Sequence, residues 1–121
     1  MVRMASTKEV GDLGERIAET FLVLKGYDIL RRNFRYAGRE IDLLVRKDGE
    51  LVAVEVKLRR GSRFGRAAES IDRRKLARIR LALEGALAGT RSTLRPRIDA
   101  ILIEFEEGLS EMVVRHIEAV Y

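Results

Sequence analysis

The chain has 121 residues, 46% of them apolar and only one of them proline, which is typical of one compact domain with a single core. It contains no cysteine and only one histidine, His116, which excludes disulfides, thiolate zinc sites and cysteine nucleophiles and argues against histidine-rich metal centres. A bound metal would therefore need oxygen ligands, which suit Mg²⁺, Mn²⁺ or Ca²⁺. The net charge of +5 favours an anionic partner.

The first expected elements are a helix and a strand. Apolar residues recur at helical spacing from Val10 to Leu24 and predict a helix over about residues 8–25, with Gly26 at its carboxyl-terminal cap. Residues 27–34 read as a strand that closes at a turn over Ala37-Gly38.

The next expected element is a hairpin. The apolar runs 40–46 and 51–57 flank Asp48-Gly49, a pair that favours a two-residue type I′ turn because both central residues need positive φ. With this turn, cross-strand partners have residue numbers that sum to 97. The prediction places Asp42 opposite Glu55 and Glu40 opposite Lys57.

The second half of the chain completes an α/β pattern. A glycine-containing basic loop over residues 59–65 precedes a helix predicted over 71–88, and a flexible crossing is expected from Gly89 to residue 93. Strands are predicted over 98–105 and 112–120. The predicted fold is a single domain over residues 1–121 with a mixed central sheet and helices packed on it. The buried stripe of the second helix should consist of Leu76, Ile79, Leu83 and Leu87.

The opposed acids carry most of the functional information. Directly opposed side chains have Cβ atoms roughly 4.5–5.5 Å apart, and like charges there are destabilising unless a cation lies between them. Asp42 and Glu55 can supply two ligands to Mg²⁺ or Mn²⁺, and the carbonyl of Val56 is an additional candidate ligand. Lys57 shares a face with Glu55 by the two-residue strand period, so it can orient water or offset charge on phosphate. Glu40 and Lys57 also fit an ordinary salt bridge.

A basic stripe follows the acids. Residues 57–80 hold ten basic residues against two acidic ones, a local excess of eight positive charges. Beside a carboxylate pair, this stripe indicates a polyanionic partner, with nucleic acid the first candidate. The alternative is a solvated, arginine-rich helix face. The residues expected to contact phosphate are Arg59, Arg60, Arg63, Arg66 and Lys75.

The chain resembles the YraN-like family of bacterial proteins, which is related to Holliday-junction resolvases and to the restriction-endonuclease-like superfamily. The matching elements run through most of the chain: Gly11, Gly14-Glu15, Gly26-Tyr27, Arg32-Asn33, Glu40-Ile41-Asp42-Leu43, Val54-Glu55-Val56-Lys57, Phe64-Gly65 and Lys75.

The resemblance implies a resolvase-like fold, with Asp42, Glu55 and Lys57 at the positions of the superfamily's Asp…Glu-x-Lys motif. It also implies that Glu15 is an extra acid of the resolvase-like branch. Periodicity alone places Glu15 at the edge of the apolar arc of the first helix, as a boundary residue or a residue of the amino-terminal turn. A homodimer is implied too, because a four-way junction has paired cleavage points. Ile41 stands in place of the proline of the superfamily's motif, and Arg39 stands where YraN-like sequences often have glycine.

Three further residues have competing interpretations. Phe64 fits a core position and equally a wedge against a base. Asp99 could be a third carboxylate of the site or a structural strand residue, and we expect His116 to be structural.

The leading hypothesis is a Mg²⁺- or Mn²⁺-dependent nuclease that acts on branched or otherwise structured DNA. The alternatives are a non-catalytic nucleic-acid-binding module on a nuclease scaffold and a protein–protein adaptor. The first residues, 1–6, lack the apolar stretch of a signal peptide, and no apolar run reaches membrane-spanning length. A cytoplasmic protein without a membrane partner is expected.

Overall fold

The computed structural model describes residues 6–60, 72–90, 93–105 and 111–120, which form two helices and a five-stranded sheet. The sheet is mixed, with strands in chain order β1-β2-β3-β4-β5, because β3 pairs with β4 in parallel and every other pair is antiparallel. This confirms the predicted α/β class and element order. The elements are α1 (Thr7–Leu24), β1 (Asp28–Tyr36), β2 (Arg39–Lys47), β3 (Glu50–Arg60), α3 (Arg73–Thr90), β4 (Arg95–Phe105) and β5 (Met112–Ile117).

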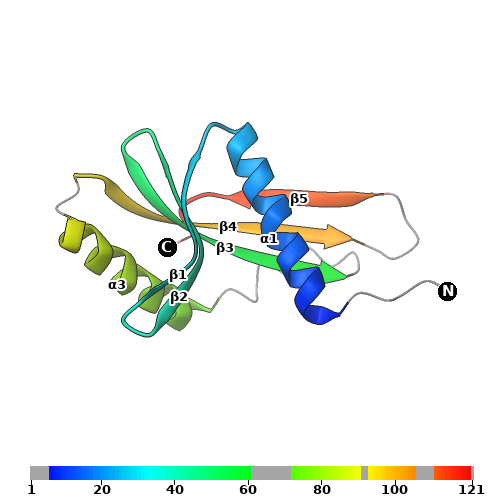
Figure 1. The fold of residues 1–121 in the computed structure, drawn as a ribbon, viewed down its shortest axis with the longest axis horizontal. Helices are drawn as coiled ribbons and strands as arrows, with labels where there is room; N and C mark the ends of the chain where they lie inside the picture. The colour runs from blue at the N-terminus through cyan, green and yellow to red at the C-terminus, as the bar shows by residue number, and fades with distance from the viewer. Residues whose placement is uncertain (1–5, 61–71, 91–92, 106–110, 121) are drawn as a thin grey trace.

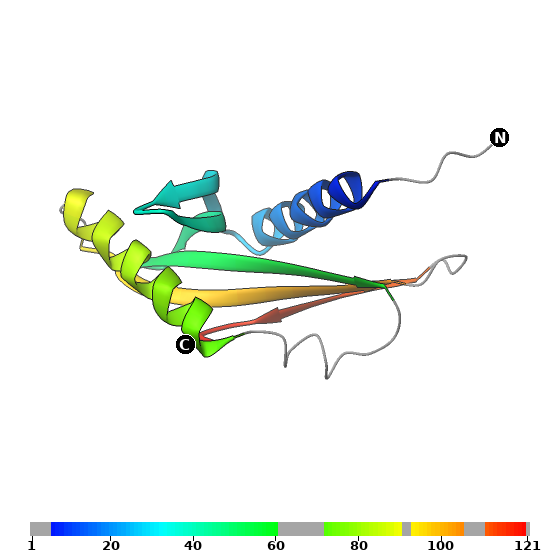
Figure 2. The same ribbon diagram turned by 90° about the horizontal axis from the view of Figure 1, so that it is seen from below.

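The helices cover the two faces of the sheet and produce two cores. Val52 and Val54 of β3 pack with Leu22 of α1, whereas Ala53 between them packs with Leu83 of α3. Successive strand residues point to opposite faces, so one strand supplies both cores. Figures 1 and 2 show α3 beside the amino-terminal ends of β3 and β4, and α1 over the carboxyl-terminal halves of these strands.

Helix α1 is fixed at both ends and lies close to the sheet. Ser6 caps its start through a capping box with Glu9, whose backbone N–H donates to Ser6 Oγ at 3.2 Å. Gly26 follows the helix with φ +92°, a conformation that favours glycine at this position. A Cβ at Gly14 would lie only 3.2 Å from Leu58 Cδ2, so glycine permits the close approach of α1 to β3.

The hairpin of β1 and β2 closes at the predicted turn, where Ala37 and Gly38 have φ values of 51° and 76°. β1 continues to Tyr36, two residues beyond the prediction. A bulge between Ile29 and Arg31 and a positive φ at Asn33 make the strand irregular beside α1. Bulges of this kind redirect neighbouring side chains.

The second half of the chain differs from the prediction at element ends. Helix α3 includes Gly89 and Thr90, which we expected in the crossing, and the predicted helix start at residue 71 lies outside the described residues. The predicted buried stripe of α3 is confirmed. β4 begins at Arg95 and so contains Pro96, which is tolerated because β5 pairs with β4 only from Ala100 onward.

β5 ends at Ile117, three residues earlier than predicted, and Ala119 beyond it has φ 52°. Among the residues that the structure describes, no helix combines the length and apolarity that crossing a membrane requires.

Candidate metal and nucleic-acid site

The predicted Asp48-Gly49 turn is present and sets the register of β2 and β3. Its two residues have φ values of 50° and 77°, as a type I′ turn requires. The strand pairs run from Lys47–Glu50 to Leu43–Val54, and each pair sums to 97 as predicted. The last pair places Asp42 and Glu55 at the next positions along the two strands.

Asp42 ends the ladder with its side chain. No backbone pair continues the ladder between the described residues of β2 and β3 beyond Leu43–Val54; instead, the backbone N–H of Val56 donates to Asp42 Oδ2 at 2.9 Å. The two carboxylates remain close enough for the charge of Asp42 to raise the pKa of Glu55 after burial itself has raised it. Where the strand pairing stops, the side chain of Asp42 thus accepts a hydrogen bond from the β3 backbone.

The predicted pairing of Glu40 with Lys57 is wrong. The register of β2 with β3 does not reach these residues, because the β1–β2 hairpin departs from β3 after Leu43. Glu40 lies opposite Arg35 of β1 and forms an ion pair with it at 3.4 Å.

Glu55 is the most deeply buried acid of the site, with only 4% of its surface exposed. Its Oε2 forms an ion pair with Lys75 Nζ of α3 at 3.0 Å. Its Oε1 is buried and has no hydrogen-bond partner among the residues that the structure describes. Such a lone buried oxygen is costly unless a cation or water binds it.

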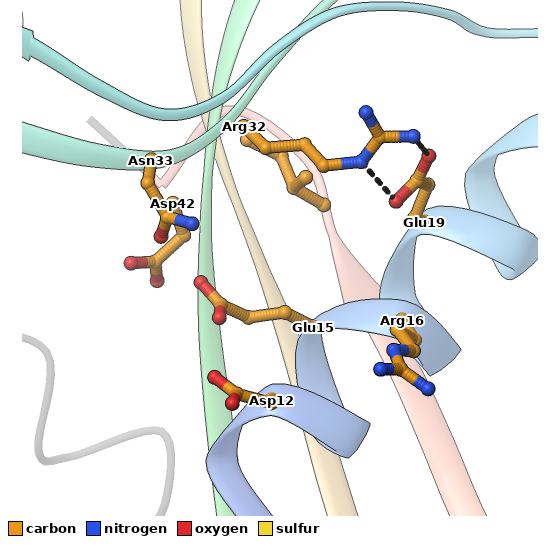
Figure 3. A pocket seen from close by; sticks show the side chains of 8 residues that line it. Asp12, Glu15, Arg16, Glu19, Arg32, Asn33 and Asp42 are labelled. Atoms are coloured by element: carbon orange, nitrogen blue, oxygen red, sulfur yellow. Dashed lines mark hydrogen bonds and ion pairs between the residues drawn. The ribbon is translucent and has the colours of Figure 1, made fainter. Parts of the chain in front are cut away.

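Asp42 and Glu15 form the other half of the acidic cluster. Burial raises the pKa of Asp42, and the Val56 hydrogen bond only partly offsets this. Burial also raises the pKa of Glu15 on α1, and the charge of Asp42 raises it further. With the amide orientation that the hydrogen-bond network favours, Asn33 donates to Glu15 Oε1 at 3.1 Å and to Glu40 Oε1 at 3.2 Å. Figure 3 shows Glu15 and Asp42 beside Asn33 in the hollow between α1 and the β1–β2 hairpin.

Asp42 lies where two hollows adjoin. One of about 230 Å³ lies between α1 and the β1–β2 hairpin and contains Glu15. The other, of about 540 Å³, lies between β2 and α3 and contains Glu55, Lys75 and Arg78. We refer to the second as the α3 cleft. The three predicted acids thus lie along a continuous, partly open surface.

The predicted lysines differ in their position. Lys57 is half-buried, and burial followed by the charge of Lys75 lowers its pKa. Lys75 was predicted to contact phosphate. In the structure its ammonium forms an ion pair with Glu55. Burial acts to lower the pKa of Lys75, but its hydrogen bond to Glu55 and the charges of Glu55 and Asp42 outweigh this and raise it.

The predicted phosphate-contacting arginines are only partly described. Arg59 and Arg60 are exposed at the end of β3, rather than in a loop as expected. Arg63, Arg66 and the wedge candidate Phe64 lie outside the described residues.

A divalent metal fits the donor set at the junction of β2 and β3. The described residues contain no cluster of three acidic, histidine or cysteine side chains suited to a metal. The candidate ligands stay those expected from the sequence, Asp42, Glu55 and the Val56 carbonyl, a small set that suits Mg²⁺ because this ion commonly uses one or two carboxylates with waters and substrate phosphate. The free, buried Oε1 of Glu55 is the observation that supports this fit.

Asp99 is not a third carboxylate of this site. It faces the α1 side of the sheet, where its carboxylate is fully buried and accepts from His116 Nε2 at 2.7 Å, from Arg97 at 2.8 Å and from the N–H of Ala119 at 3.0 Å. Burial alone would raise the pKa of Asp99, but these hydrogen bonds outweigh it and lower the pKa. His116 is structural here, as expected.

Sequence reasoning missed Arg97, which also contacts Glu50 and the hydroxyl of Tyr27. The alternation of Arg97 and Asp99 along one strand was the available signal, because residues two apart share a face.

Comparison with known proteins identifies the family. Residues 14–103 match the model of the uncharacterised protein family UPF0102. A UPF0102 protein of Roseiflexus castenholzii is 42% identical over 110 residues, which cover 89% of each chain. A relative in Corynebacterium efficiens is 41% identical over 114 residues, covering 93% of this chain and 92% of its own. One in Neisseria gonorrhoeae is 44% identical over 95 residues, covering 78% and 83%.

The fold and site define an α/β protein with an acidic pair at the end of a β-ladder. The chain belongs to UPF0102, which confirms the resemblance to the YraN-like family. The matched residues include Glu15, Asp42, Glu55, Lys57 and Lys75.

Proposed function

We propose that this protein is a metal-dependent nuclease of restriction-endonuclease-like fold that hydrolyses phosphodiester bonds in DNA, with branched or structured DNA as substrate. The observation that carries the proposal is the pair of a partly buried Asp42 and a buried Glu55, in which one oxygen of Glu55 has no hydrogen-bond partner among the described residues. Two partly desolvated acids with raised pKa values are costly to keep together, and a divalent cation would offset that cost.

The residues have separate roles in this reaction. Asp42, Glu55 and the carbonyl of Val56 would hold Mg²⁺ or Mn²⁺, which would polarise the phosphoryl group and lower the pKa of bound water. Lys57 would orient the attacking water or offset charge that develops on phosphate. The oxygen of that water would form the new bond to phosphorus as the bond to the leaving oxygen breaks, with one proton of the water lost to solvent and one proton taken from solvent by the leaving oxygen. Glu15 would support the metal from α1.

The basic residues fit substrate binding. Arg59 and Arg60 extend from the end of β3 past Lys57, and Arg78 lines the α3 cleft. Contacts of this kind position a nucleic acid without reading its sequence. A homodimer would place two such sites on one branched substrate.

A cleavage assay with Mg²⁺ or Mn²⁺ tests the proposal. Linear, flapped and four-way DNA would be incubated with wild type, Asp42→Asn, Glu55→Gln and a control, Asp48→Asn. The control removes one carboxylate but retains the turn, because Asn-Gly also favours type I′. We expect cleavage by wild type and Asp48→Asn, with a loss of at least about a hundredfold in the other two variants.

Equal cleavage results for wild type and Asp42→Asn on every substrate would refute the proposed nuclease activity of this site. Salt-sensitive DNA binding that persists in Asp42→Asn and Glu55→Gln, without cleavage or Mn²⁺ binding by wild type, would instead identify a non-catalytic binding module.

A further inference from the structure

Lys75 occupies the position in which a cation would neutralise the acidic pair. It reaches from α3 across the α3 cleft, and its Nζ lies 3.0 Å from Glu55 Oε2. Glu55 is almost fully buried, whereas the side chain of Lys75 remains 48% exposed. The acid is therefore fixed by the core, and its counter-charge comes from a long side chain with access to solvent.

The ion pair leaves the site incompletely satisfied. Lys75 contacts Oε2 of Glu55, but Oε1 stays buried, with no hydrogen-bond partner in the described part of the chain. The charges of Lys75 and Lys57 both act on Asp42 and Glu55, so what stays unsatisfied is the hydrogen bonding of Oε1 rather than the charge of the pair. Lys75 also lies near the second ammonium group of the site, since its charge contributes to the lowered pKa of Lys57.

We propose that Lys75 is a displaceable internal cation, which holds Glu55 when no metal is bound and moves into the α3 cleft when a divalent metal binds. This inference rests on the proposed function, because it assumes that Asp42 and Glu55 bind a metal. A doubly charged ion beside Glu55 would repel the Lys75 ammonium. The side chain can follow that repulsion because it is flexible and half-exposed.

The displacement links metal binding to substrate binding. In the metal-free protein the ammonium of Lys75 is shared with Glu55, so it is less available to phosphate than a lysine without an acidic partner. After displacement its ammonium would face the same cleft as Arg78. The metal would thus add its own charge to the site and release a lysine for the polyanionic substrate.

Metal affinity tests this exchange without any measurement of cleavage. Mn²⁺ would be titrated calorimetrically into metal-free wild type, Lys75→Met, Lys75→Arg and Arg78→Met. Arg78→Met is the matched control, because it removes one positive charge from the same cleft. Lys75→Met should bind Mn²⁺ about five- to thirtyfold more tightly than wild type, since no ion pair must be broken. Lys75→Arg and Arg78→Met should stay within about threefold of wild type.

Thermal unfolding provides the second readout. Lys75→Met should be less stable than wild type without metal and nearly as stable at saturating Mn²⁺, because the metal replaces the missing cation. If Lys75→Met does not fold without metal, recovery of the fold with Mn²⁺ but not with NaCl supports the exchange, and no recovery overturns it.

The outcomes separate this inference from the proposed function. Equal or weaker Mn²⁺ binding by Lys75→Met, with binding by wild type intact, overturns the exchange and leaves the nuclease proposal standing. An equal gain in affinity in Arg78→Met also overturns it, because the effect would then be general electrostatics. Failure of wild type and all variants to bind Mn²⁺ overturns both.

Discussion

Replacement of Asp42 by asparagine or by alanine should separate its structural and chemical roles. Its carboxylate accepts the backbone N–H of Val56 at 2.9 Å where the β2–β3 ladder ends. Asparagine can still accept this hydrogen bond through its amide oxygen, whereas alanine cannot. Both substitutions remove the charge that a metal would need.

The magnitudes follow from burial and charge. An unsatisfied, partly buried N–H costs about 1–3 kcal/mol. A third hollow, beside α1 and lined by Asp42 and Val56, gives water some access to this N–H, so we expect about 1–2 kcal/mol. Burial raises the pKa of Asp42, so the fold disfavours its ionised form. A neutral amide avoids that penalty. Asp42→Asn should therefore be at least as stable as the metal-free wild type.

Urea unfolding at pH 7.5 with a metal chelator measures this difference. We expect the unfolding free energy of Asp42→Ala to lie about 1–2 kcal/mol below that of Asp42→Asn, while neither variant binds Mn²⁺. Agreement of the two unfolding free energies within about 0.3 kcal/mol would show that the Val56 hydrogen bond does not stabilise the fold.

Two further predictions concern the framework around the site. Asp99→Asn should lower the unfolding free energy by about 2–4 kcal/mol at pH 7, because the partly buried Arg97 keeps Glu50 as its one carboxylate partner among the described residues. The pKa of Asp99 in the folded state lies below its ordinary value of 3.8. The difference in unfolding free energy between wild type and Asp99→Asn should therefore persist above pH 3.8 and shrink as the pH falls below it. A difference that is unchanged at pH 2.5 would contradict the lowered pKa. Gly14→Val should lower the unfolding free energy by about 1–3 kcal/mol, since even a Cβ there meets Leu58 at 3.2 Å, whereas the matched Gly11→Val has open space and should change it by less than about 0.5 kcal/mol. Urea unfolding of both variants tests this, and equal effects would show that the close approach of α1 is not tightly packed.

Local signals were sufficient for the elements and for the central hairpin. Asp48-Gly49 specified a turn with two positive φ values, and a two-residue turn fixes the register of its strands. That register placed Asp42 and Glu55 at the same end of the ladder. The strand ends at Pro96 and Ile117 were misplaced, because pairing with distant strands decided where β4 begins and β5 stops. Helix α3 continues past Gly89, which is exposed.

The sequence by itself determined the turn, the register and the two-faced pattern of β3, since all three depend on neighbouring residues and on the two-residue strand period. Only the tertiary structure decided that Asp42 binds the β3 backbone, that Glu40 pairs with Arg35, and that Asp99 lies on the opposite face. It also brought Lys75 from α3 onto Glu55, twenty residues away in the chain. Such contacts depend on how the helices pack across the sheet, and no periodicity within a single segment encodes that geometry.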